Sequence, residues 1–125
     1  MIPAETILSS TKANAIRMIK ANLEENDKWV LRAVIVIFQR QTASEQVAET
    51  TREENGIGFN GVDAQILSSF AKQIIDFEAG KSRYNTPLSP KQMGIARRKI
   101  TKYAGQILQI MKEKEATKKA IETAA

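Results

Sequence analysis

The sequence predicts an all-α protein, a single compact bundle of about five helices around a central apolar helix at residues 28–40. Apolar residues recur at spacings of three and four in several stretches, which is the period of an amphipathic helix. Only residues 28–40 have the β-branched composition of a buried strand, and no second strand is available to pair with them. A chain of 125 residues fits one domain. We assign residues 1–112 to that domain and expect residues 113–125 to be a charged tail that frays.

The first expected helix begins after a cap at Ser10 or Thr11 and ends near residue 25. Residues 1–6 precede it, and we expect an irregular lead-in there because Pro3 interrupts regular structure. One face of the helix is apolar and consists of Ala15, Ile16, Ile19 and Leu23.

The segment at residues 28–40 follows a second cap signal at Asn26 and Asp27 and is apolar almost all round. Its β-branched residues would also suit a buried strand, but a lone strand leaves its backbone groups unsatisfied. A helix that is apolar on every side is one that other helices surround, so we interpret this segment as the centre of the domain. Trp29 is expected to pack in the core rather than to contact a ligand.

The middle of the chain contains two further predicted helices and a glycine-rich loop. Thr42 and Glu45 match a capping box, which predicts a new short helix that ends near residue 53. The loop occupies residues 55–62, and an amphipathic helix at residues 63–78 ends before Gly80. The apolar stripe of that helix consists of Leu67, Phe70, Ala71, Ile74 and Ile75.

The last predicted helix follows a connector at residues 81–88 and has the strongest start signal in the chain. Ser89 is at the cap, Pro90 is at the first position and Gln92 is at the third, and the helix is expected to run past Met111. Its apolar face consists of Met93, Ala96, Ile100, Tyr103, Ala104, Ile107 and Met111. A second face carries Lys91, Arg98 and Lys102, flanked by Arg97 and Lys99.

Charge is distributed very unevenly along the chain. Residues 79–112 contain eight Lys or Arg residues and no Asp or Glu. Residues 1–78 have a net charge of −3 and residues 79–125 a net charge of +8, which together give the +5 of the whole chain. This polarity favours an anionic partner, with nucleic acid the simplest candidate, and the alternative is a merely solvated basic surface. The residues expected to hold phosphates are Lys81, Arg83, Lys91, Arg97, Arg98, Lys99 and Lys102, with Tyr84 as a stacking partner.

The composition argues against an enzyme. The chain contains no Cys and no His, which excludes disulfides and thiolate metal sites and removes the commonest general base. We therefore expect no catalytic residue, no metal and no cofactor. The longest apolar run, residues 33–38, is far shorter than the roughly 20 residues that span a bilayer. With no signal-peptide pattern either, we expect a cytoplasmic protein without a membrane partner.

The loop glycines Gly56, Gly58 and Gly61 spell G-x-G-x-x-G. A dinucleotide site needs a strand before this motif, whereas a polar helical segment precedes it here. Two interpretations remain: free amides at the start of the next helix hold an anion, or the loop is a structural turn followed by an Asp63 cap. Phe59 is expected in the core, with base stacking as its alternative. The predicted secondary contact with nucleic acid consists of Gly56, Gly58, Phe59 and Asn60.

Several short motifs between residues 55 and 108 resemble a known module. They are Gly58-Phe59-Asn60 with Asp63-Ala64, then Ser69 and Ala71, then Leu88-Ser89-Pro90-Lys91-Gln92, and Lys102-Tyr103-Ala104-Gly105-Gln106. Through them the sequence resembles a small module of phage and plasmid proteins that is found near helicase-like proteins and has no established activity. The resemblance implies a viral or mobile-element origin, a role near DNA and, for a viral protein, a location in the host cytoplasm.

Two functions are consistent with the sequence. The first is a non-enzymatic nucleic-acid-binding accessory protein of phage or mobile-element type, which contacts phosphates through its basic helix. The alternative is a phage-type protein-interaction module that inhibits a host defence complex, as anti-CRISPR proteins do, by binding protein. The expected partner is thus nucleic acid or a protein complex that handles nucleic acid.

Overall fold

The computed structural model describes residues 1–47 and 58–124, and within these residues it contains helices and no strand. Five of the helices have eleven residues or more, so the predicted all-α fold is confirmed. The elements are α1 (Ala4–Leu8), α2 (Lys12–Glu25), α3 (Asp27–Val47), α4 (Ala64–Glu78), α5 (Pro90–Ile100), the 3₁₀ turn η1 (Thr101–Tyr103) and α6 (Ala104–Ala124).

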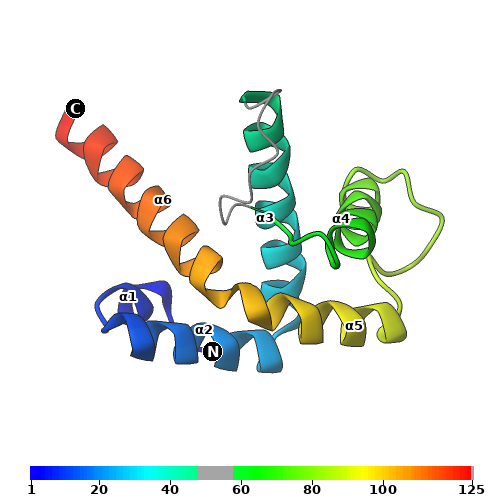
Figure 1. Ribbon diagram of the computed structural model, residues 1–125, viewed down its shortest axis with the longest axis horizontal. Coiled ribbons are helices and arrows are strands. Elements are labelled where there is room, and N and C mark those ends of the chain that lie inside the picture. The colour runs from blue at the N-terminus through cyan, green and yellow to red at the C-terminus, as the bar shows by residue number, and fades with distance from the viewer. Residues whose placement is uncertain (48–57, 125) are drawn as a thin grey trace.

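Helix α3 is the centre of the bundle, as its apolar composition predicts. It contacts α2, α4, α5 and α6, and Figure 1 shows it standing across the line formed by α2 and α5, with α4 against one side. Val30, Val34 and Ile37 are completely buried. Burial of aliphatic side chains of this size stabilises the fold by roughly 1.5–3 kcal/mol each.

The N-terminal segment is more ordered than its proline suggests. Helix α1 buries Ile7 completely, so the expectation of an irregular lead-in was wrong. The reason is a tertiary contact that local sequence does not reveal. The buried side chain of Asn22 on α2 accepts a hydrogen bond from the backbone N–H of Ile2 at 2.8 Å and donates one to its carbonyl at 2.9 Å.

The predicted break before Thr42 is absent, because α3 continues to Val47. The capping-box pattern of Thr42 and Glu45 therefore does not start a helix. Extending an existing helix needs no new nucleus, and the residues of this segment tolerate a helix interior. The rest of that predicted helix, residues 48–53, lies outside the described residues.

Three predicted helix signals are confirmed. Thr11 caps α2 by accepting a hydrogen bond from the Asn14 N–H at 3.3 Å. Ser89 and Gln92 form a reciprocal capping box at the start of α5, with distances of 3.2 and 3.0 Å. Helix α4 ends in a Schellman motif at Gly80, whose φ of +74° favours glycine.

The last predicted helix is divided by η1 into α5 and α6. The hydroxyl of Thr101 donates a hydrogen bond to the carbonyl of Arg97 at 2.8 Å, a bond that competes with the helix ladder and often bends it. Figure 1 shows α6 turning away from the line of α5 and forming an open V with the C-terminal half of α3.

Helix α6 extends through the segment that we assigned to a tail. It is helical to Ala124, and almost all side chains at residues 112–122 are exposed. Fraying of these last turns stays a prediction. Within residues 1–47 and 58–124, none of the helices combines the length and the apolar character needed to cross a membrane.

Candidate functional site

Asp63 is a completely buried carboxylate at the start of α4. It occupies the cap position but makes no capping hydrogen bond, so the predicted Asp cap was wrong. Asn60 satisfies this end of the helix instead. Its side-chain oxygen accepts from the Asp63 N–H at 3.0 Å and its carbonyl from the Ala64 N–H at 2.9 Å. The carboxylate of Asp63 is therefore free to face another part of the chain.

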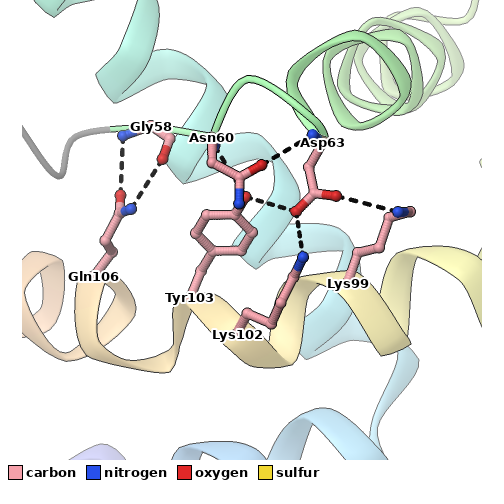
Figure 2. A network of polar contacts seen from close by, with 7 residues as sticks. All are labelled: Gly58, Asn60, Asp63, Lys99, Lys102, Tyr103 and Gln106. Atoms are coloured by element: carbon pink, nitrogen blue, oxygen red, sulfur yellow. Dashed lines mark hydrogen bonds and ion pairs between the residues drawn. The ribbon is translucent and has the colours of Figure 1, made fainter. Parts of the chain in front are cut away.

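The partners of this carboxylate come from α5 and η1 (Figure 2). Lys99 Nζ lies 3.1 Å from Asp63 Oδ1, and Lys102 Nζ lies 2.7 Å from Oδ2. The Tyr103 hydroxyl donates a further hydrogen bond to Oδ2 at 2.8 Å. Two lysines and one phenol thus surround a single buried anion and join the start of α4 to the junction of α5 and α6.

The electrostatics of this cluster fix its protonation. Burial raises the pKa of Asp63, but hydrogen bonds from Lys102, Tyr103 and Lys99 outweigh that effect and lower the pKa to about 2. Burial and the neighbouring Asp63 raise the pKa of Tyr103 to about 12. Neither group changes protonation near neutral pH, which a general acid or base needs to do. The contacts of the cluster give Asp63 and Tyr103 a structural role.

The described part of the glycine-rich loop is bound to the same helices. The Gly58 N–H donates to Gln106 Oε1 and its carbonyl accepts from Gln106 Nε2, both at 2.9 Å. The N–H groups of Phe59 and Asn60 donate to Gln41 Oε1 at 2.8 Å and to the Tyr103 hydroxyl oxygen at 3.0 Å. These three amides therefore have partners within the chain and offer nothing to a bound anion.

Phe59 is buried and meets the Tyr103 ring edge-to-face at a centroid distance of 5.6 Å, which confirms its predicted place in the core. Gly56, the remaining member of the predicted secondary contact, lies outside the described residues. The structural-turn interpretation of the loop is the one that the described contacts support.

The fold divides the seven predicted phosphate-binding residues into two groups. Lys99 and Lys102 pair with Asp63. Arg97 forms an ion pair with Asp27 and donates to the Leu23 carbonyl at 2.9 Å. Three of the seven predicted phosphate-binding residues thus have internal acidic or carbonyl partners. Their acids lie far away in sequence, so a local count of charges does not find them.

The second group consists of the other four cations. Lys81, Arg83, Lys91 and Arg98 are exposed, and none has an ion-pair partner within the described part of the chain. Tyr84 keeps 60% of its surface exposed. The Arg83 guanidinium carbon lies 5.7 Å from the centroid of the Tyr84 ring, within the range of a cation–π interaction.

Two shallow hollows meet at Tyr84. One has a volume of about 460 Å³ and is lined by Lys72, Asp76, Lys81 and Arg83 among others. The other has a volume of about 490 Å³ and includes Lys91. Both share Tyr84 and Gln73. We call the surface formed by Lys72, Gln73, Lys81, Arg83, Tyr84 and Lys91 the Tyr84 surface.

Hydrogen bonds join the elements that carry the Tyr84 surface. The side-chain amide of Gln73 on α4 donates to the Pro87 carbonyl at 3.1 Å and to Gln92 Oε1 at 2.9 Å. Leu88 is buried. The end of the connector, at Pro87 and Leu88, is therefore fixed to α4 and to the capping box of α5. Lys72, on α4, is a member of this surface that the charge run did not identify.

The comparisons with other proteins add no relative to this picture. No protein-family model matches the chain, and comparison with curated proteins and with solved structures finds no significant match. Among the described residues, no group of three or more acidic side chains is arranged to hold a metal ion.

Proposed function

We propose that this protein is a non-enzymatic nucleic-acid-binding accessory protein that contacts its polymer through the Tyr84 surface and Arg98. The observation that carries the proposal is an exposed tyrosine surrounded by cations without ion-pair partners among the described residues. Cations on a fixed scaffold hold phosphates, and an exposed aromatic ring offers a face on which a base stacks. The phage or mobile-element origin is part of this proposal and rests on the sequence resemblance.

The arrangement favours a single-stranded polymer. A base stacks on Tyr84 only if it is free of its neighbours, as bases in single strands and loops are. Lys91 and Arg98 are two turns apart on α5 and extend the positive surface beyond the connector. Asp76 lines the hollow on the Lys81 side and repels a phosphate there. We therefore place the backbone path on the Lys91 side of Tyr84.

Fluorescence anisotropy with labelled single-stranded DNA, duplex DNA and RNA over a salt series tests this proposal. Each phosphate contact contributes a slope of roughly −0.7 in log affinity against log salt for single strands. The double variant Lys91→Gln with Arg98→Gln should bind more weakly and lose about 1.4 from that slope. The matched control, Lys12→Gln with Arg17→Gln, removes the same charge from α2 at the other end of the molecule (Figure 1). Equal weakening by both pairs, or no binding at low salt, would refute the proposal.

The second candidate is a protein-interaction module of phage type that inhibits a host defence complex. The observation that favours it is the internal pairing of Arg97, Lys99 and Lys102, which leaves a smaller positive surface than the sequence predicts. Exposed tyrosine and arginine side chains are also typical centres of protein interfaces. Capture of one stoichiometric protein complex from nuclease-treated host lysate, lost on Tyr84→Ala with Arg83→Gln, would favour this candidate over the first.

A further inference from the structure

A second concave surface lies between α3 and α6, on elements that the Tyr84 surface does not use. It is a groove of about 410 Å³, within the range of roughly 300–1,000 Å³ that small-molecule sites occupy. Its walls include Trp29, Ala33 and Val36 from α3, and Ile107 and Met111 from α6. The walls are overwhelmingly apolar, so water in the groove has few hydrogen-bonding partners and an apolar ligand can displace it.

The polar groups of the groove are almost all positive. Lys28 and Arg32 lie one turn apart on α3, and Lys114 lies on α6. None of the three has an ion-pair partner among the described residues, and no acidic residue lines the groove.

Two acids adjacent to these cations in the chain form ion pairs elsewhere, and Glu115, which follows Lys114, does not line the groove. Asp27, which precedes Lys28, pairs with Arg97. Glu113, which precedes Lys114, pairs with Arg40, and the Arg40 hydrogen bond lowers the pKa of that glutamate. Within the lining of the groove, the charges of Lys28, Arg32 and Lys114 are therefore not balanced by an acid.

We propose that this groove binds an anionic amphiphile, a single unbranched aliphatic chain that ends in a carboxylate. The chain lies against Trp29, Val36 and Met111, and the carboxylate faces Lys28, Arg32 and Lys114. Charge complementarity selects the sign of the head group, and the apolar walls select the tail. An extended peptide fits less well, because the apolar lining offers almost no partners for its backbone N–H and C=O groups.

The protein contains a built-in reporter for this site, because Trp29 is its only tryptophan. We would titrate the full chain with dodecanoate below its micelle concentration and follow tryptophan emission. The expected result is a saturable change with one equivalent bound. Dodecyltrimethylammonium, which has the same tail and the opposite charge, should bind at least about tenfold more weakly. Equal binding of the two probes, or no saturable change with dodecanoate, would overturn the proposal without any variant.

Two variants sharpen the test. Lys28→Gln with Arg32→Gln should weaken dodecanoate binding about tenfold, since a charge-assisted contact is lost. The control pair Lys12→Gln with Lys20→Gln removes the same charge from the exposed face of α2 and should leave affinity unchanged. An equal loss of dodecanoate affinity in both double variants would show that only the net charge of the protein matters, and would refute the site.

The alternative occupant of the groove is a second copy of the chain, and a measurement of oligomeric state distinguishes it from a bound amphiphile. Sedimentation velocity of the ligand-free protein measures this state. If the wild type is a dimer and Val36→Glu is a monomer, the groove lies in an interface between two copies and the proposal is overturned. A monomer that binds one dodecanoate supports it. The titration does not involve nucleic acid, so its result is independent of the function proposed for the Tyr84 surface.

Discussion

The Nζ atom of Lys102 lies 2.7 Å from Oδ2 of the buried Asp63 and connects the basic helix region to the start of α4. This ion pair shows that not every cation of the basic run at residues 79–112 is available to an external partner. Lys102 has the composition and position of a phosphate ligand, yet its ammonium group already neutralises an internal anion. A buried carboxylate without such partners would be strongly unfavourable, so this lysine and its neighbour Lys99 have a structural role.

Asp63→Asn should lower the free energy of unfolding by about 2–4 kcal/mol. Removing one partner of a buried ion pair leaves the others without compensation, but both lysines are partly exposed and can regain water. Urea unfolding followed by far-UV circular dichroism measures the change. The control is Asp76→Asn, which removes an exposed carboxylate from the same helix and should change stability by less than about 0.5 kcal/mol. Equal stability of the two variants would show that the cluster contributes little.

The same carboxylate predicts a contribution to acid sensitivity. The pKa of Asp63 is lowered from 3.8 to about 2 in the folded protein. The folded state therefore binds its proton less readily than the unfolded state, and the stabilisation is present above about pH 4 and is lost as the pH falls toward 2. Comparing the pH dependence of unfolding for the wild type and Asp63→Asn isolates this contribution, expected to be at most about 2 kcal/mol. Parallel curves between pH 5 and 2 would contradict it.

Gly58 predicts a backbone effect that its neighbour Gly61 does not share. Gly58 has a φ of +87°, and a Cβ there would lie 2.5 Å from Cβ of Gln41. Gly58→Ala should therefore destabilise the protein by about 2–3 kcal/mol, through left-handed strain and the forced displacement of Gln41. Gly61→Ala meets nothing within 4 Å and should be nearly neutral. Thermal unfolding measures both, and similar melting temperatures would argue against this loop geometry.

The sequence predicts the fold well where signals are local. The apolar period locates α2, α4 and α5, and Thr11, Gly80 and Ser89 mark ends that the structure confirms. It fails where a tertiary contact or an existing helix overrides the local pattern. The capping box at Thr42 is overridden by the continuing α3, and Asn22 orders a segment that Pro3 was expected to disrupt.

The candidate site, like the fold, could be predicted from the sequence only in part. The charge run identifies the basic residues, but only the fold determines which of these cations have internal partners. Asp27 and Asp63 approach Arg97, Lys99 and Lys102 from distant parts of the chain, so no local count identifies these pairs. Lys72 joins the Tyr84 surface from α4, outside the run of basic residues.

The internally paired cations and the unpaired ones should differ in what their substitution changes, protein stability or nucleic-acid affinity. Lys102→Gln should lower the free energy of unfolding by about 1–3 kcal/mol and change nucleic-acid affinity by no more than about twofold. Arg98→Gln should leave stability within about 0.5 kcal/mol and weaken binding severalfold at low salt. Urea unfolding and fluorescence anisotropy on the same preparations measure both properties. Equal loss of affinity in the two variants would return Lys102 to the set of phosphate ligands.

Tyr84 provides the most direct test of the proposed interface. Tyr84→Ala should weaken binding of single-stranded nucleic acid by about 1–3 kcal/mol, the range for loss of one base-stacking contact. Stability should hardly change, because the side chain is 60% exposed. Tyr84→Phe keeps the ring and should bind nearly as well as the wild type. Anisotropy at fixed salt measures these affinities. If Tyr84→Phe binds as weakly as Tyr84→Ala, the hydroxyl group rather than the ring makes the contact, and stacking is excluded.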